Sequence, residues 1–190
     1  MSSLLIVAFA ASLLCGYTDI IYNCLVRARN EIKLAWANID VLLVQRHDEL
    51  PKLIEVCKGY MHHEHDTLER VVQARDAALR ARNVGNVASV SAAEGVLGGG
   101  LDGLFAVAEG YPQLKANTLF QNLQTRITAL ETAIADRREV YNDAVNALNV
   151  RIESVPDALV ARLFGFRVAQ TLQFSAEQMR DVDVKLAFGG

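Results

Sequence analysis

The sequence predicts an all-α fold, in which an N-terminal membrane helix continues into an antiparallel bundle of about four long helices. Three observations indicate this fold. Residues 1–18 contain no charged side chain, apolar residues recur at intervals of three and four along most of the remaining chain, and only three prolines and 7% aromatic residues occur in 190 residues. With 52% hydrophobic residues and a mean hydropathy of +0.17, the composition excludes a disordered chain and favours membrane attachment.

Net charge and cysteine usage exclude several classes of protein. The chain has 19 basic and 22 acidic residues, which gives a formal net charge of -3. Proteins that bind nucleic acids neutralise phosphates with an excess of basic residues, so we expect no nucleic-acid partner. The three cysteines, Cys15, Cys24 and Cys57, are an odd number without a CxxC pair. They predict neither a disulfide framework nor a cysteine zinc site.

Residues 1–18 form the predicted membrane anchor. As a helix they span about 27 Å, slightly less than a typical hydrocarbon core. A cleaved signal peptide is one alternative, but the basic region that starts such peptides is missing and no small-x-small cleavage pattern follows closely. A buried or interfacial helix is the other. We expect an uncleaved, single-pass anchor built from Leu4, Leu5, Ile6, Val7, Phe9, Leu13 and Leu14.

An apolar stripe continues this helix beyond the anchor. We expect the helix to end near Arg46, because Pro51 suits the first turn of a new helix and disfavours helix before it. Asp48 is the expected cap of the second helix, which fades at Asn83, and residues 83–89 read as the first loop. The stripe consists of Ile21, Leu25, Ala28, Ile32, Ala35, Ile39 and Leu42.

A third helix is expected at about residues 90–110, although it contains five glycines. Each interior glycine costs about 0.5 to 1 kcal/mol of helix stability relative to alanine, so something must compensate. Small residues allow helix backbones to approach closely, which favours a tight packing face over the alternative of an apolar loop. We predict an oligomer or packing face made by Gly95, Gly99 and Gly103, together with Phe164 and Phe166.

The fourth helix gives the strongest periodic pattern in the chain. Asn117 is its expected N-cap, and Pro156 stops it. Three-four spacing persists for about five heptads, as in a coiled coil, and predicts a rod about 50 Å long. Residues 157–174 read as a short amphipathic helix. The expected organisation of the chain is an anchor at 1–18, a helical bundle at 19–174 and a tail at 175–190. The seam comprises Phe120, Leu123, Ile127, Leu130, Ile134, Tyr141, Ala144, Leu148 and Ile152, with Arg137 as its charged member.

Two carboxylates fall where the helical pattern expects apolar side chains, namely Glu64 and Glu94. A buried carboxylate needs a partner, because an unpaired buried charge costs several kcal/mol. Arg137 or Arg138 could supply one, and we predict a structural polar layer of Glu64, Glu94 and Arg138. Catalysis by the two carboxylates is the alternative, but no motif marks a nucleophile or substrate pocket.

The remaining polar motifs predict no catalytic, metal or cofactor site. In the HHEHD run, helical spacing pairs His62 with Asp66 and His65 with Glu69, which could bind a divalent ion, but a solvated helix face explains them better. His47 next to Asp48 lacks an accompanying nucleophile and reads as a turn cap. The glycine-rich run lacks the spacing that cradles phosphate.

Several segments together resemble the LemA family of bacterial membrane proteins. The resemblance implies an N-terminal membrane helix, a bundle of long helices, a short outside N-terminus and no established enzymatic activity. Because relatives include a protein needed to form magnetosome membranes, it also implies a role in organising membrane. The resemblance covers about residues 22–166 and is carried by the segments YNCLVRARNEIKLAWANIDVLLVQRHDELPKLIEVCKGYMHHEHDTLERVVQAR, AEGYPQLKAN, RREVYNDAVNALNVRI and ARLFGF.

The expected function is that of a non-enzymatic scaffold, anchored in the bacterial inner membrane, that self-associates into a homo-oligomer and organises or remodels membrane. Its expected partners are membrane lipid and further copies of the chain. The alternative is a monomeric tethered adaptor that recruits an unidentified envelope or protease partner. Positive charges follow the span at Arg27, Arg29 and Lys33, so the positive-inside rule favours a cytoplasmic over a periplasmic bulk.

Overall fold

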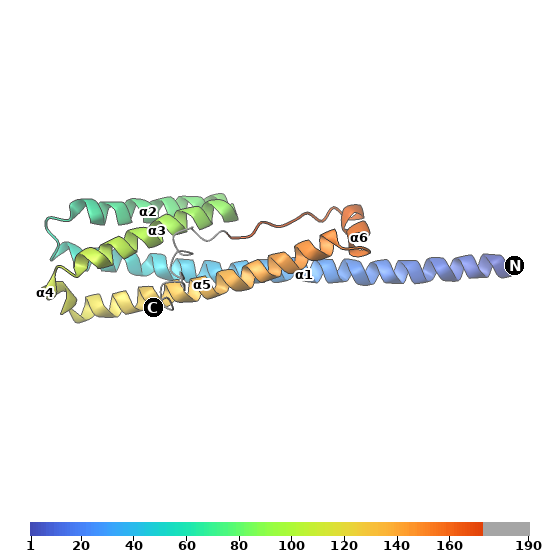
Figure 1. Ribbon diagram of the computed structural model, residues 1–190, viewed down its shortest axis with the longest axis horizontal. Coiled ribbons are helices and arrows are strands. Elements are labelled where there is room, and N and C mark those ends of the chain that lie inside the picture. Colours follow the sequence, from blue (N-terminus) through green and yellow to red (C-terminus); the bar gives the residue numbers. More distant parts are fainter. Residues whose placement is uncertain (173–190) are drawn as a thin grey trace, which may run out of the picture. The chain divides into compact units, whose positions relative to one another are not determined.

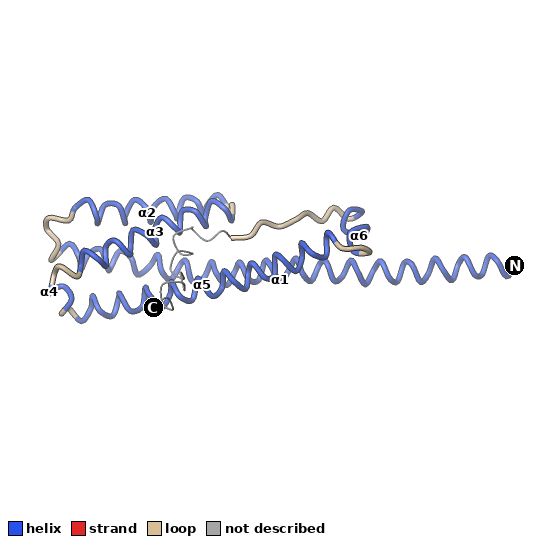
Figure 2. Tube along the Cα trace, in the orientation of Figure 1, coloured by secondary structure: helices blue, strands red, loops and turns tan. Residues whose placement is uncertain are grey.

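The computed structural model describes residues 1–172, and over this range all regular structure is helical (Figures 1 and 2). The predicted all-α fold is confirmed, whereas the expected tail at 175–190 lies outside the described residues. The helices are α1 (Ser2–Lys58), α2 (His65–Val84), α3 (Val87–Ala108), α4 (Pro112–Lys115), α5 (Thr118–Glu153) and α6 (Asp157–Leu163).

The chain folds into two compact units, which share α1 and α5. The anchor unit comprises Met1–Ile39 and Arg137–Thr171, and the bundle unit comprises Asp40–Asp136 with the described residue Leu172. Each unit has its own apolar core. The domain boundaries expected after residues 18 and 174 stay predictions.

Helix α1 does not end near Arg46 as expected, but continues through Pro51 to Lys58. Because proline has no N–H group, the carbonyl of His47, four residues earlier, loses its helical donor. Arg75 Nε on α2 donates to that carbonyl at 3.3 Å. Fully buried Leu50 and Leu53 flank the proline. Tertiary contacts thus outweigh the local preference, and neither Asp48 nor His47 is a turn cap.

Replacing Pro51 with alanine is expected to raise the free energy of unfolding, by up to about 3 kcal/mol, because alanine restores the missing helical donor. The measurement is urea unfolding in mild detergent, followed by circular dichroism. Arg75→Met serves as the control: its cost of about 1 kcal/mol in the native background should shrink beside Pro51→Ala, where the His47 carbonyl has its helical partner again. Equal costs in both backgrounds would show that Arg75 does not compensate for the proline.

The connections on the two sides of α2 differ from the prediction: residues 59–64, before α2, are not helical, and the connection after α2 is shorter than expected. His62 lies in the turn between α1 and α2, not on a helix, because α2 begins only at His65. The connection from α2 to α3 is two residues long. Gly85 adopts a φ of 73°, which glycine tolerates, and the Asn86 side chain accepts hydrogen bonds from the first backbone amides of α3. The loop expected at 83–89 is therefore mostly helix.

Helix α5 follows its prediction closely. The Asn117 side chain caps it by accepting hydrogen bonds from the Leu119 and Phe120 amides at 2.9 and 3.2 Å. The helix ends at Glu153, shortly before Pro156. Arg137, expected in the seam, is instead exposed. Buried members of the observed seam are Phe120, Leu123, Ile127, Ile134, Tyr141, Val145 and Leu148.

In the anchor unit, α6 packs onto α1 and α5 (Figure 1). The expected amphipathic piece at 157–174 is helical only to Leu163, because Gly165 adopts a φ of 70°. The following segment is extended and hydrogen-bonds to α5: the Asn149 side chain donates to the Ala169 carbonyl at 2.9 Å and accepts from the Ala169 amide at 2.8 Å. The shared core is formed by Ile21, Leu25, Ala28, Leu148, Val160 and Ala161.

Candidate functional site

The first turns of α1 expose a continuous apolar surface. A window of 18 residues near the N-terminus has a mean hydropathy of 2.0 and is only 6% buried. Such a surface is unfavourable in water and is typical of a membrane contact. In the anchor unit, α1 extends alone toward the N-terminus (Figure 1). All the residues predicted to form the anchor are more than half exposed: Leu4, Leu5, Ile6, Val7, Phe9, Leu13 and Leu14.

Within residues 1–172, a second helix, α3, is also long and apolar enough to cross a membrane, with a mean hydropathy of 1.2. It differs from the start of α1 because one of its faces is buried in the bundle unit. Leu97, Leu101 and Leu104 of α3 are fully buried in the core. Glu94 on the same face is also buried and ion-paired. These contacts make α3 a core helix of the bundle.

The glycines of α3 face open space rather than another helix of this chain. A Cβ atom added at Gly95, Gly99 or Gly103 would meet no heavy atom within 4 Å. Only Gly100 lies against a neighbour, with its Cβ position 3.7 Å from Val71 Cγ2 on α2. The glycine face therefore does not compensate its helix cost by packing within the described chain, and its contact with a second copy stays a prediction.

A buried charged layer crosses the bundle unit. Arg46 and His47 of α1 and Glu94 of α3 are each no more than 3% exposed. One oxygen of Glu94 accepts a hydrogen bond from Arg46, and the other lies 3.0 Å from His47 Nε2. Arg46 Nη1 also lies 3.6 Å from Glu131 Oε1 on α5. The layer thus joins three helices of the unit.

Opposing effects set the ionisation of Glu94. Burial raises its pKa, whereas the hydrogen bond with His47 and the electrostatic interactions with Arg46 and His47 lower it, and the net effect places the pKa below its ordinary value. Glu94 is therefore a carboxylate at neutral pH. Because it is also shielded from solvent, a dissolved substrate cannot reach it. The arrangement suits an internal ion pair that fixes helix register.

The predicted partners of this layer lie elsewhere. Glu64 is half-buried in the turn after α1, where it accepts a hydrogen bond from the Tyr111 hydroxyl at 3.4 Å. Arg138 lies on α5 in the anchor unit. The structure pairs Glu94 with Arg46 and His47, so the grouping of Glu64, Glu94 and Arg138 stays a prediction.

Arg46 and His47 were missed by sequence reasoning because α1 was expected to end there. Had the helix been continued through Pro51, the three-four spacing of Ile39, Leu43, Arg46, Leu50 and Leu53 would have placed Arg46 in the buried stripe. The same spacing in α3 did reveal Glu94. A charge at a stripe position on each of two helices is the pattern that predicts a buried pair.

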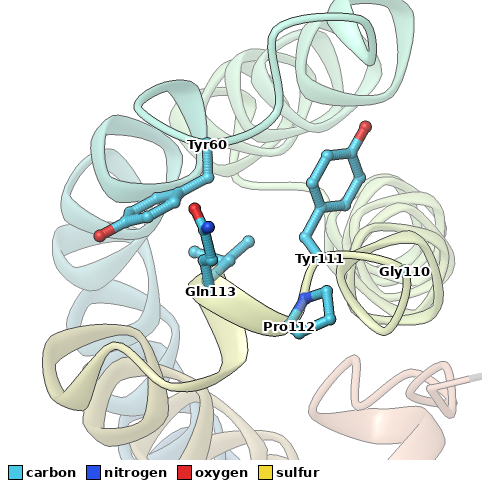
Figure 3. Close-up of a pocket in the computed structure, with 6 residues that line it drawn as sticks. Tyr60, Gly110, Tyr111, Pro112 and Gln113 are labelled. Carbon is cyan, nitrogen blue, oxygen red and sulfur yellow. The ribbon is translucent and has the colours of Figure 1, made fainter.

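A small pocket lies at one end of the bundle unit (Figure 3). Its volume is about 290 Å³, and no charged residue lines it. The Tyr60 hydroxyl accepts a hydrogen bond from the Asn117 side chain at 3.1 Å, which holds that ring at the rim. Such a neutral pocket offers aromatic and backbone contacts but no acid-base pair. The lining residues are Tyr60, Gly110, Tyr111, Pro112, Gln113 and Leu114.

The histidine-rich turn is solvated. His65 Nε2 and Glu69 Oε2 lie 4.0 Å apart on α2, with side chains 87% and 53% exposed. Over residues 1–172, no three histidine, cysteine or acidic side chains come close enough to hold a metal ion.

A family model built from LemA proteins matches residues 35–188, most of this chain. The chain belongs to the LemA family. The resemblance of its motifs is thereby confirmed, and the match includes the buried layer and the pocket of the bundle unit.

Relatives of this LemA family member include magnetosome proteins. Magnetosome protein MamQ 2 of Paramagnetospirillum magneticum is 25% identical, over 91% of this chain and 70% of its own length. Magnetosome protein MamQ of Magnetospirillum gryphiswaldense is 23% identical, over 88% of this chain and 68% of its own. Protein LemA of Metamycoplasma hominis is 28% identical, over 85% of this chain and 73% of its own length. Together with the exposed apolar start of α1, these relationships support a membrane-associated helical protein.

Proposed function

We propose that this protein is a membrane-anchored helical scaffold that self-associates into a homo-oligomer on the bacterial inner membrane. The observation that carries the proposal is the uninterrupted course of α1, from the exposed apolar residues at its start to the buried layer of the bundle unit. One helix thus supplies both the lipid contact and a core element of the fold. The scaffold acts through its surfaces and catalyses no reaction.

Surface composition supports self-association. Besides the open glycines, α3 exposes Val96, which is 66% accessible. Burial of apolar surface drives most protein association, and most oligomers are symmetric assemblies of identical chains. Of the predicted oligomer face, the proposal places the contact between copies at the glycine row of Gly95, Gly99 and Gly103, whereas Phe164 and Phe166, the other predicted members, follow α6.

Charge supports the orientation. Arg27, Arg29 and Lys33 are exposed on α1 just beyond the apolar segment. Lysine and arginine close to a span favour the cytoplasmic side, so the bulk of the protein faces the cytoplasm. The magnetosome relatives suggest what the assembly does there: it organises or remodels the membrane that carries it.

The test is the mass of the detergent-extracted full-length protein, measured by light scattering, for the native chain and for Gly99→Leu. The native protein is expected to form a discrete particle of several chains, and Gly99→Leu to form a smaller one. Gly99 is exposed and an added Cβ atom meets no heavy atom of the chain within 4 Å, and leucine strengthens the helix by about 0.8 kcal/mol, so the variant should still fold.

Gly98→Leu is the matched control. A Cβ atom added at Gly98 also meets no heavy atom within 4 Å, but Gly98 is not in the predicted row of Gly95, Gly99 and Gly103. Its particle should keep the native mass. If both variants dissociate equally, the assembly does not depend on this row. If the native protein is a monomer, the scaffold proposal is wrong.

A monomer would favour the adaptor, the second candidate function. The pocket between Tyr60 and Tyr111 is the observation that supports it, since tyrosines and a proline that rim a neutral hollow are typical of surfaces that bind a protein segment. In that case an envelope or protease partner, not a second copy, would be sought.

A further inference from the structure

We propose that α6 and the phenylalanine that follows it dock on the lipid surface beside the anchor, as a second, interfacial membrane contact. The inference rests on the proposed membrane insertion of residues 1–18 and adds a contact from a segment more than a hundred residues later in the chain. Its occupant is the headgroup region of a bilayer that contains anionic lipid.

The position of α6 in the anchor unit supports this contact. Val160 and Ala161 pack against Ile21 and Leu25 of α1, directly after the apolar segment ends at Thr18. The ring of Phe164 lies 4.7 Å, centroid to centroid, from that of Tyr22. If residues 1–18 occupy the hydrocarbon, these contacts hold α6 at the level where the bilayer meets water.

The exposed side of α6 is apolar. Leu159 and Leu163 lie four residues apart and therefore share a helix face, and they are 66% and 77% exposed. Phe164, 53% exposed, follows them. The other side, with Val160 and Ala161, is buried in the unit's core. A seven-residue helix that is apolar on both its covered and its open side is poorly suited to water but well suited to the boundary between headgroups and acyl chains.

Basic side chains surround this apolar patch. Arg162 and Arg167 flank Leu163 and Phe164 in sequence, and both are exposed. Arg29 of α1 lies over the ring of Phe166, with its guanidinium carbon 5.2 Å from the ring centroid. The acid of α6 itself, Asp157, is paired with Arg151 at 3.7 Å, and the exposed acids Asp19 and Glu153 lie on α1 and α5. This distribution is complementary to anionic headgroups, which each basic residue near the surface attracts.

The experiment places a single tryptophan in the full-length protein in vesicles of phosphatidylcholine and phosphatidylglycerol. Trp36 is the chain's only tryptophan and is first replaced by phenylalanine. Leu163→Trp then reports on α6, Leu13→Trp on the anchor, and Leu34→Trp is the matched control. Leu34 is 65% exposed on the same helix α1, about 24 Å beyond Thr18 at the helical rise per residue.

With lipids brominated near the headgroup end of their acyl chains, Leu163→Trp is expected to lose a large fraction of its fluorescence, and its emission maximum should shift to shorter wavelength. Leu34→Trp is expected to keep its fluorescence with these lipids and to be quenched by iodide in the water. The shift should be larger with phosphatidylglycerol than with phosphatidylcholine alone. Circular dichroism checks that each variant is folded.

The other outcomes overturn the inference in distinguishable ways. Quenching of Leu13→Trp without quenching of Leu163→Trp leaves the anchor intact and removes the α6 contact. If Leu163→Trp is shielded from both bromine and iodide, a second copy of the chain covers α6 instead of lipid. If neither variant is quenched by bromine, membrane insertion itself fails, and the proposed function fails with it.

Discussion

A Glu94→Leu variant is expected to lose about 3 kcal/mol of its free energy of unfolding, because it removes the nearer carboxylate partner of buried Arg46 and leaves that guanidinium with Glu131 alone, at 3.6 Å. Arg46 is only 3% exposed, so water cannot replace the lost carboxylate without opening the helix packing. Urea unfolding in mild detergent, followed by circular dichroism, measures the loss.

The double variant Arg46→Met with Glu94→Leu separates the ion pair from simple packing. Both replacements are apolar and of similar length, so the double variant should recover most of the stability that the single variant loses. Losses that simply add would show that Arg46 and Glu94 do not depend on each other.

Acid provides an independent measurement of the same pair. The pKa of Glu94 lies below its ordinary value in the folded protein, so its contribution to stability is present above pH 4.5 and is lost as the pH falls through the folded-state pKa. The stability difference between the native protein and Glu94→Leu should therefore shrink as the pH falls below 4.5 and through the folded-state pKa of Glu94. A difference that grows over that range would contradict the assignment of Glu94 as a stabilising carboxylate.

The helices could be predicted from the sequence wherever local chemistry and tertiary packing agree. In α5, Asn117 provides the cap and the three-four seam provides the buried face, and both were found where expected. They conflict at Pro51, where local preference breaks the helix but the Arg75 side chain, distant in sequence, supplies the missing donor. A contact between residues 47 and 75 is visible only once the two helices are packed.

The same conflict between local preference and packing limited how much of the buried charged layer could be predicted from the sequence. Glu94 could be predicted because a charge interrupts the clear apolar stripe of α3, whereas Arg46 was hidden at an expected helix end. The open side of the glycine row could not be predicted either. Periodicity predicts that Gly95, Gly99 and Gly103 share a face, but not whether α2 or solvent lies opposite them. The apolar start of α1, by contrast, depends only on local composition, and its predicted side chains are all exposed, although their contact with lipid stays a prediction.

Two arginines in the anchor, Ile6→Arg with Phe9→Arg, are expected to release the protein from the membrane. Each arginine near the centre of a span opposes insertion by about 2.5 to 3.5 kcal/mol, and together they exceed what the short, 18-residue segment can offset. The measurement is the share of protein that stays with cell membranes after a carbonate wash.

Leu34→Arg is the matched control for the released variant. Leu34 is 65% exposed, against 66% for Phe9, and lies on the same helix, but outside the apolar segment. It should therefore leave the protein in the membrane fraction. Phe9 and Leu34 expose large apolar side chains on the same helix, so Phe9→Arg alone is compared with Leu34→Arg, and lipid around Phe9 with water around Leu34 is the arrangement that makes only the first substitution weaken retention. Retention of the two-arginine variant would mean that another surface, such as α6, is sufficient to hold the protein at the membrane.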